Sequence, residues 1–338
     1  MGDEPLVACP MRSAIADALE SQGLRTLALP AGGDLDPRAA IVIRAAVGAW
    51  SPHVVHTHCA HAHASALVAG VHRRSPLIVH RRVDFSIGHG IFTYVKYRAF
   101  PVHYICVSKA VSEVMRAGGI PDSRLTTIYS GIHPPRILDR RARLALAERL
   151  GMPLSRRWIG CVGSLVEHKG HIDLIQAFGE IARARDDIRL ALIGSGPMDK
   201  KLRAQVDALG LTDRVRFLGH IGHPTDAMQL LDVYVVPSRQ EGLNTSLLDA
   251  CALGLPIVAS QAGGIPEVVD ERCGWPVPPR SPAALAQAIL DALASTEEAR
   301  ERGRAARARI ASRFTVERMT QETRKLYDKQ LIHFGGRS

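Results

Sequence analysis

Two carboxylates and a glycine pair frame residues 237–269 of this chain, PSRQEGLNTSLLDACALGLPIVASQAGGIPEVV. Glu241 opens the stretch, Asp249 follows eight residues later, and Gly263-Gly264 closes it. The small polar residues at 244–246 predict the N-cap of a helix. A helix N-terminus binds anions such as phosphate, and carboxylates accept hydrogen bonds from hydroxyl groups. The array therefore predicts a site for a sugar attached to a diphosphate.

Each acid of this array also has a simpler explanation when it is taken alone. Asp249 is the kind of first-turn acid that the helix dipole favours, and Glu241 is an ordinary solvated loop acid. Together they are harder to dismiss. Glu241 would accept from the sugar, the free amides at the helix N-terminus would bind a phosphate, and Asp249 would accept from ribose hydroxyls.

Three more predicted strands end in glycine turns, in CVGSLVEHKG, LIGSGP and RVRFLG. Ligands of open α/β sheets gather at the carboxyl ends of the strands. Gly163 would admit a ligand close to the backbone, and Lys169 supplies a cation that suits a diphosphate. Taken singly, each turn is also explained as an ordinary strand-to-helix connection that needs glycine.

The composition is that of a globular protein with about two domains, since the chain has 338 residues and 46% hydrophobic residues. We expect no membrane span, and the N-terminus MGDEPLVACP does not read as a secretory signal. The six scattered cysteines fit reduced thiols. A cytoplasmic protein, or one bound peripherally to the inner face of the membrane, is the expected localisation.

The net charge of +10 is concentrated in the first part of the chain. Residues 1–145 contain 17 Lys and Arg against 10 Asp and Glu, and ten of the 15 histidines. This favours an anionic partner, such as a phosphorylated acceptor or an anionic membrane, although solubility alone also explains it. With 5% aromatic residues and no basic-aromatic interleaving, we expect no nucleic acid partner.

Short apolar runs alternate with amphipathic segments along the whole chain, which predicts an α/β protein with parallel sheets covered by helices. A Pro- and Arg-rich stretch between residues 131 and 157 is the predicted domain boundary. The expected divisions are an acceptor-binding Rossmann-like domain at 1–145, a donor-binding Rossmann-like domain at 146–313, and a helix at 314–338 that packs back on the first domain.

The motifs VGSLVEHKG, LIGSGP, VRFLG, PSRQEG, LLDACALGLPIVAS and GGIPEVV resemble the retaining glycosyltransferases of family four (glycosyl transferases group 1). The resemblance implies the GT-B fold, with two doubly wound parallel-sheet domains facing a cleft. It also implies no metal and no cofactor, the nucleotide-sugar being a substrate. Glu241 and position 249 would form the family's Glu-x7-Glu signature, with Glu241 facing the donor sugar and Lys169 neutralising the departing diphosphate. The donor-binding residues implied or predicted are Gly163, Ser164, Lys169, Gly194, Gly196, Leu218, Gly219, Glu241, Gly242, Leu243, Asn244, Thr245, Ser246 and Asp249.

Two positions depart from the family pattern. Asp249 is one methylene shorter than the usual Glu, so the ribose contact is longer or water-mediated, or the helix lies closer. Ser164 stands where many relatives carry Arg, so one phosphate cation is missing unless Arg239 or another basic residue replaces it.

The first half resembles the family's acceptor domain through HVVHTHCAHAHA, 53–64, and LIVHRRVDFSIG, 77–88. Either His80 or Arg82 would be the catalytic-site residue near the transferred sugar, because the register is ambiguous. The histidines at 56, 58, 61 and 63 with Cys59 raise zinc as an alternative, but a polar strand end that lines the cleft is the favoured interpretation.

Basic residues surround the apolar-aromatic segment IFTYVKYRAF, 91–100, which suits a phospholipid surface or a polyprenyl-phosphate acceptor. A solvated basic loop beside core aromatics explains it equally well. Family members begin with a strand, a glycine-rich loop and a helix before sequence like that at residues 6–30. We therefore expect this chain to lack about one strand-helix unit, with unpaired strand edges, low stability and weak activity.

The expected function is transfer of a sugar from a UDP- or GDP-linked donor to an acceptor hydroxyl with retention, in cell-envelope or lipid-linked glycan synthesis. The expected partners are the donor and a glycan, lipid-linked or phosphorylated acceptor. A GT-B epimerase or phosphorylase is a second enzyme hypothesis. A non-catalytic or weakly active nucleotide-sugar binding protein is the alternative from another class.

Overall fold

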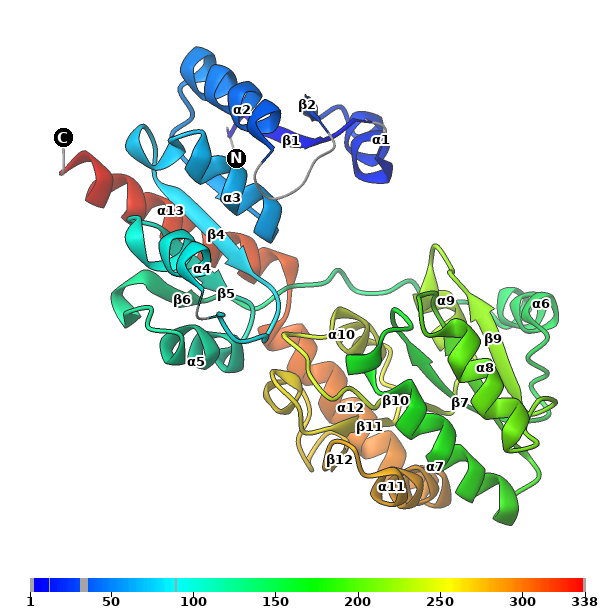
Figure 1. Cartoon of the computed structure of the whole chain (residues 1–338). Helices are drawn as coiled ribbons and strands as arrows, with labels where there is room; N and C mark the ends of the chain where they lie inside the picture. The colour runs from blue at the N-terminus through cyan, green and yellow to red at the C-terminus, as the bar shows by residue number, and fades with distance from the viewer. Residues whose placement is uncertain (1–2, 12, 31–35, 89, 337–338) are drawn as a thin grey trace.

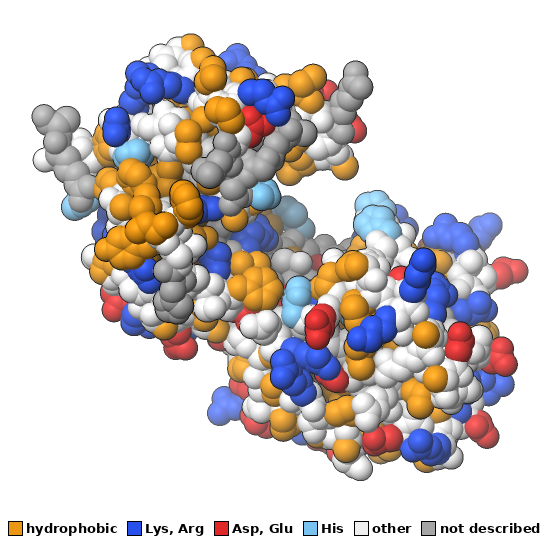
Figure 2. All heavy atoms as spheres, viewed as in Figure 1, with side chains coloured by type: hydrophobic (Ala, Val, Ile, Leu, Met, Phe, Trp, Pro, Cys, Tyr) orange, Lys and Arg blue, Asp and Glu red, His pale blue; other side chains and the backbone are white. Residues whose placement is uncertain are grey.

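The computed structural model describes residues 3–11, 13–30, 36–88 and 90–336. The molecule has two lobes, and the chain passes from one to the other twice (Figure 1). A deep hollow separates the lobes on one side of the molecule, and they touch at the other (Figure 2).

The first lobe contains two parallel sheets, ordered β1-β2 and β3-β4-β5-β6. Within the ladders of the described residues, β1 and β3 each pair with a single strand. Helices α2 and α3 lie against one another beside the sheets. The elements are β1 (Leu6–Pro10), α1 (Ala14–Ser21), β2 (Arg25–Leu29), α2 (Pro37–Trp50), β3 (Val55–Thr57), α3 (Ala60–Val68), η1 (Val71–Arg73), β4 (Leu77–Arg81), α4 (Ile91–Tyr94), η2 (Val95–Ala99), β5 (His103–Cys106), α5 (Lys109–Ala117), η3 (Asp122–Arg124) and β6 (Leu125–Thr127).

The second lobe is a six-stranded parallel sheet of order β12-β11-β10-β7-β8-β9. Strands β8 and β9 are added on one side of β7 and strands β10 to β12 on the other, so the strand order reverses between β7 and β10. Such a reversal in a doubly wound sheet opens a crevice at the carboxyl ends of the strands. The elements are α6 (Arg140–Leu150), β7 (Arg157–Val162), η4 (Glu167–Lys169), α7 (His171–Ala184), β8 (Ile188–Ile193), α8 (Asp199–Ala208), β9 (Val215–Gly219), α9 (Pro224–Met228), β10 (Val233–Val236), α10 (Thr245–Ala252), β11 (Ile257–Ser260), η5 (Ile265–Glu267), β12 (Trp275–Val277), α11 (Pro282–Ala294) and α12 (Thr296–Arg313).

Burial of apolar strand residues explains the sheet of the second lobe. In the second lobe, β8 and β10 are almost wholly apolar and buried, and α7 and α11 cover them with Leu, Ile, Ala and Phe side chains. Strands buried on both faces lose the alternation of a half-exposed strand, as the sequence predicted.

The last helix, α13 (Val316–Gly335), returns to the first lobe. Leu326 packs with Ile78, Ile105 and Ile128 beneath the four-stranded sheet. The two crossings between the lobes also touch, because the Ile132 amide donates to the Phe314 carbonyl at 3.0 Å.

The predicted alternation of apolar strands and helices is present in both lobes. The helix α6 lies inside the stretch that was predicted as the domain boundary. The prediction of an α/β protein with parallel sheets is confirmed.

Candidate functional site

The glycine turns after β7, β8 and β9 meet at one edge of the second sheet. The Gly194 amide donates to the Gly219 carbonyl at 2.7 Å, and the Gly163 amide donates to Ile193 at 2.9 Å. Gly194 has a φ of +142°, and an added Cβ there would overlap the Gly163 carbonyl. Glycine is therefore required because two backbones approach closely.

The other predicted turn residues lie beside these glycines. An added Cβ at Gly196 would meet the Leu165 backbone, so this glycine too allows a close approach. Ser164 is exposed next to Gly163, and Leu218 is half-buried before Gly219.

Lys169 and Glu241 come together although 72 residues separate them. The Lys169 Nζ lies 2.5 Å from Glu241 Oε2, and both side chains are mostly buried, with 20% and 10% of their surfaces exposed. The Asn244 amide nitrogen also donates to Glu241 Oε2, at 3.1 Å. A partly buried ion pair costs desolvation energy, so such a pair is retained where its charges have a use.

The predicted helix N-terminus is present as α10. Asn244 is its N-cap, and its side-chain oxygen accepts from the Leu247 amide at 2.9 Å. Leu243 is buried, Thr245 is exposed and Ser246 is half-buried. The N-terminus of α10 therefore begins at a residue that contacts the Glu241 carboxylate. Such an N-terminus suits an anionic group beside it.

Asp249 lies half-buried in α10, and burial raises its pKa from 3.8 to about 6. Burial also raises the pKa of the neighbouring Tyr234, and the charge on Asp249 adds to that rise. A desolvated carboxyl of this kind has unused capacity for accepting hydrogen bonds.

Arg239 does not supply the missing phosphate cation in this structure. Its guanidinium forms two 2.8 Å hydrogen bonds with the carboxylate of Asp173. A bidentate pair of this geometry holds the arginine in place. The sequence interpretation that Arg239 compensates for Ser164 is therefore not supported here.

The loop after β4 brings the first lobe to the second. An added Cβ at Gly242 would overlap the Arg82 carbonyl oxygen, so the two loops are in backbone contact. The Glu241 amide donates to the Asp84 carboxylate at 2.9 Å. The ring of Phe85 also meets that of His168 edge-on, with centroids 5.4 Å apart. Sequence reasoning missed Asp84, because nothing local marks a loop acid as the partner of an amide 157 residues away.

Glu267, in η5, contacts the first lobe. Its carboxylate accepts from the Lys109 and Ala110 amides, both at 3.0 Å. These are the first two amides of α5, whose N-cap is Ser108, and the Tyr129 hydroxyl also donates to Glu267, at 2.7 Å. The lobes are therefore connected at the N-terminus of α5 as well as at Gly242.

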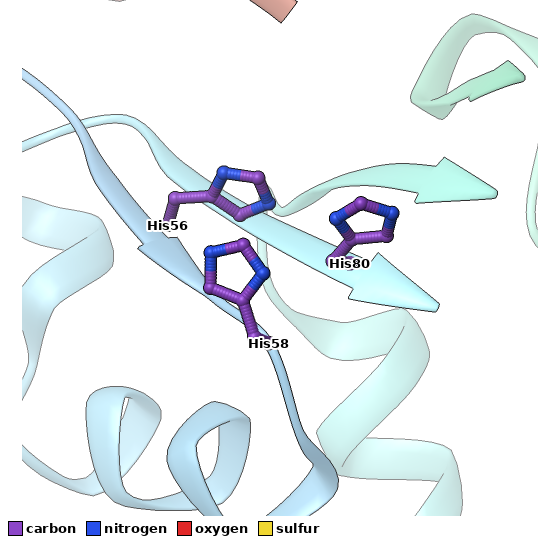
Figure 3. A group of neighbouring side chains, drawn as sticks. All are labelled: His56, His58 and His80. Atoms are coloured by element: carbon purple, nitrogen blue, oxygen red, sulfur yellow. The ribbon is translucent and has the colours of Figure 1, made fainter. Parts of the chain in front are cut away.

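His80 and Arg82 are placed differently. His80 is buried within β4, and desolvation first, then the charge of Arg82, lower its pKa to about 3. Arg82 lies beyond the strand end with an exposed side chain. His56 and His58 lie beside His80 (Figure 3). The structure does not bring together all the possible zinc ligands that the sequence offered at residues 56–63. His63, on α3, is buried against Tyr97 and Tyr104 instead.

An apolar groove of about 650 Å³ lies in the first lobe, lined by residues of α3, the loop after β4, α4 and η2. Figure 2 shows hydrophobic side chains gathered on this lobe. Phe92 and Ile91 are 80% and 69% exposed, and Arg81 and Lys96 also line the groove. Of the helices in the described residues, none combines the length and apolar character needed to cross a bilayer.

This architecture is the GT-B fold. A glycosyltransferase from Rickettsia africae superposes with a TM-score of 0.85 at 18% identity, over 98% of this chain and 91% of that one. Anabaena Alr3699/HepE in complex with UDP-glucose superposes with a TM-score of 0.84 at 23% identity, over 96% and 91% of the two chains.

Two family models together match most of the chain. Residues 1–136 match the family model described as Glycosyltransferase Family 4, and residues 156–295 match that described as Glycosyl transferases group 1. A Mycobacterium tuberculosis glycogen synthase is 31% identical over 66% of this chain and 52% of its own length. A GDP-mannose-dependent phosphatidylinositol monomannoside mannosyltransferase of Mycolicibacterium smegmatis is 32% identical over 55% and 52%. The chain thus spans about half the length of the curated relatives that it matches.

Proposed function

We propose that this protein transfers a sugar from a nucleotide-diphosphate sugar to an acceptor hydroxyl with retention of configuration. The Lys169–Glu241 pair in front of the α10 N-terminus carries the proposal. It places a cation, a sugar-binding carboxylate and anion-binding amides at one point. Similarity to UDP- and GDP-sugar-dependent proteins supports a UDP- or GDP-linked donor.

We assign each group a part in the reaction. The bond between the anomeric carbon and the diphosphate breaks, and a bond to the acceptor oxygen forms on the same face. Lys169 and the amides of α10 stabilise the negative charge that develops on the leaving diphosphate. Glu241 orients the sugar, Asp249 accepts from the ribose, and a diphosphate oxygen takes the acceptor proton. No resident metal or cofactor is part of this proposal.

The test is Glu241→Gln, assayed with a panel of UDP-, GDP- and ADP-sugars chosen by thermal shift. We expect transfer to fall at least about 100-fold, as when a charge-stabilising contact in an active site is lost, while the fold is kept. Glu180→Gln, which changes an exposed acid on α7, is the matched control. Wild-type transfer by the Glu241 variant would remove Glu241 from the mechanism.

The Ser164 and Asp249 departures favour a second candidate, a nucleotide-sugar binding protein without activity. Such a protein would be stabilised by the donor but would release no nucleoside diphosphate from any donor of the panel, with or without acceptors. Diphosphate release by the wild type would exclude it.

For the acceptor, we propose a lipid-linked or phospholipid molecule whose apolar chain enters the groove beside α4. Phe92 and Ile91 expose apolar surface of the kind that membrane-associated proteins insert between lipids. Arg81 and Lys96 provide positive charge in the same groove. Anionic vesicles should therefore bind better than zwitterionic ones.

This proposal is tested with Phe92→Ser in a vesicle co-sedimentation assay. We expect binding to phosphatidylglycerol vesicles to fall several-fold, while Ile137→Ser, which changes a residue that is 60% exposed in the linker, leaves binding unchanged. Equal sedimentation of wild type and the Phe92 variant would rule out the groove as the lipid contact.

A further inference from the structure

Three histidines share one face of the first lobe's sheet at its carboxyl edge. In the parallel register of β3 and β4, His56 lies opposite Ile78 and Thr57 opposite Val79. Because successive side chains of a strand alternate between faces, His56, Ile78 and His80 point to the same side. His58 follows β3 directly, and Figure 3 shows its ring turned toward the other two.

The donor atoms of these rings are close enough to share one ion. One ring nitrogen from each histidine lies within 4.8 Å of the others. Nitrogens that bind zinc at about 2.0–2.1 Å in a tetrahedral site lie about 3.3 Å apart. Small side-chain rotations, chiefly of the exposed His58, would close that difference. In the described part of the chain, this is the single group of three or more His, Cys, Asp or Glu side chains with donor atoms so near.

Three of the ring nitrogens in this cluster have no hydrogen-bond partner among the described residues. Both ring nitrogens of His80 and the Nε2 of His56 are buried without a hydrogen bond among the described residues. Buried polar atoms are nearly always satisfied, so such atoms call for a missing partner such as an ion. His56 Nδ1 lies 2.6 Å from the Tyr327 hydroxyl of α13. If Nδ1–H donates to this oxygen, the lone pair of Nε2 faces the cluster.

We propose that His56, His58 and His80 bind a borderline divalent transition-metal ion, with Zn²⁺ as the reference ion. Three imidazoles without a carboxylate select Zn²⁺, Co²⁺, Ni²⁺ or Cu²⁺ over Mg²⁺ and Ca²⁺, which prefer oxygen ligands. Three protein ligands leave a coordination position for water or another small ligand.

The site would connect three elements that the chain brings together only in the folded state. His56 belongs to β3, His80 to β4, and Tyr327 to α13, so a bound ion would stabilise the docking of α13 on the sheet. The exposed Arg82 is the nearby positive charge, and it opposes a cation at His58 and His80. Arg82→Gln should therefore strengthen metal binding.

The test is Zn²⁺ titration of the chelator-treated full-length protein in competition with a chromogenic chelator. Co²⁺ absorption in the visible range provides a second readout that does not depend on activity. We expect one Zn²⁺ per chain and a rise in Tm on binding. His58→Asn and His80→Asn should each weaken Zn²⁺ binding at least about 100-fold, and Tyr327→Phe about tenfold, as for other groups that orient a ligand.

Two variants on the same stretch serve as controls. His53→Asn changes an exposed histidine outside the cluster, and Cys59→Ser changes the exposed thiol next to His58; both should keep wild-type binding. Circular dichroism of each metal-free variant separates loss of a ligand from loss of the fold, and His58→Asn is the least disruptive because its ring is exposed. Zn²⁺ affinity unchanged in the His58 and His80 variants, or no tight Zn²⁺ binding by the wild type, would overturn the proposal.

Discussion

At the scale of single residues, the burial of Asp249 lowers the stability of the folded protein at neutral pH. Burial raises the pKa of this carboxyl to about 6, against 3.8 for the unperturbed group. The folded state therefore holds the proton more tightly than the unfolded state. The stability contributed by the protonated form is complete below about pH 3.8 and is lost as pH rises through about 6.

Asp249→Asn should therefore stabilise the ligand-free protein at pH 8, on the order of 1 to 2 kcal/mol after allowance for solvent screening. The gain should be smaller at pH 5. Denaturant unfolding at both pH values measures it, with the exposed Asp213→Asn as control. If Asp249 binds ribose, the same variant loses nucleotide affinity. A variant less stable than wild type at pH 8 would contradict the electrostatic argument.

The residues of the donor site could be predicted from sequence to different extents. Asn244 was predictable as a cap because capping is local, within three residues. The Lys169–Glu241 pair was predicted only as two members of one site, through the family resemblance. The sequence left open whether Arg239 replaces the missing cation, because its partner Asp173 is 66 residues away in sequence and is marked by no local pattern.

At the scale of elements, the loop after β4 touches the loop that carries Glu241 and Gly242. This contact is possible because Gly242 has no side chain. Gly242 has no Cβ, and this allows the Arg82 carbonyl to approach its backbone. The approach also permits the hydrogen bond between the Glu241 amide and Asp84. Gly242 thus belongs to the interface between the lobes as well as to the candidate donor-binding loop.

Gly242→Ala should push these loops apart. We expect a loss of about 1–3 kcal/mol in stability, typical of an overpacked site, and weaker donor binding because Glu241 moves with its loop. Gly222→Ala is the control, since an added Cβ there meets nothing within 4 Å. Thermal unfolding and nucleotide titration measure the two effects, and identical values for both variants would contradict the interpretation.

At the scale of the whole molecule, Glu267 holds one lobe to the other. Its carboxylate accepts from the first two amides of α5 and from the Tyr129 hydroxyl. Desolvation, together with this carboxylate, raises the pKa of Tyr129 to about 12. Glu267 thus connects α5 and Tyr129 of the first lobe to the second lobe.

Glu267→Ala should remove the two hydrogen bonds to the first amides of α5 and the tyrosine contact together, while Ser108 remains the N-cap of that helix. Loss of hydrogen bonds to a charged group costs about 1.5–3 kcal/mol, and the pKa of Tyr129 should fall toward 10, as ultraviolet titration would show. We also expect a larger radius of gyration in X-ray scattering, because one contact between the lobes is lost. Glu271→Ala, on an exposed acid of the same segment, should change none of these. A tyrosine titration equal to that of wild type would refute this account.

The sequence by itself determined the local pieces: the buried strands of the second lobe, the glycine turns after β7 and β8, and the Asn244 cap. Each depends on hydrophobic pattern, backbone freedom or a hydrogen bond a few residues away, and these are written in neighbouring residues. The tertiary structure decided which distant residues meet. Asp84 with Glu241, Glu267 with α5, and His56 of β3 with Tyr327 join segments 157 to 271 residues apart. Only the packed sheets and the return of α13 bring such segments together, so no local pattern could reveal them.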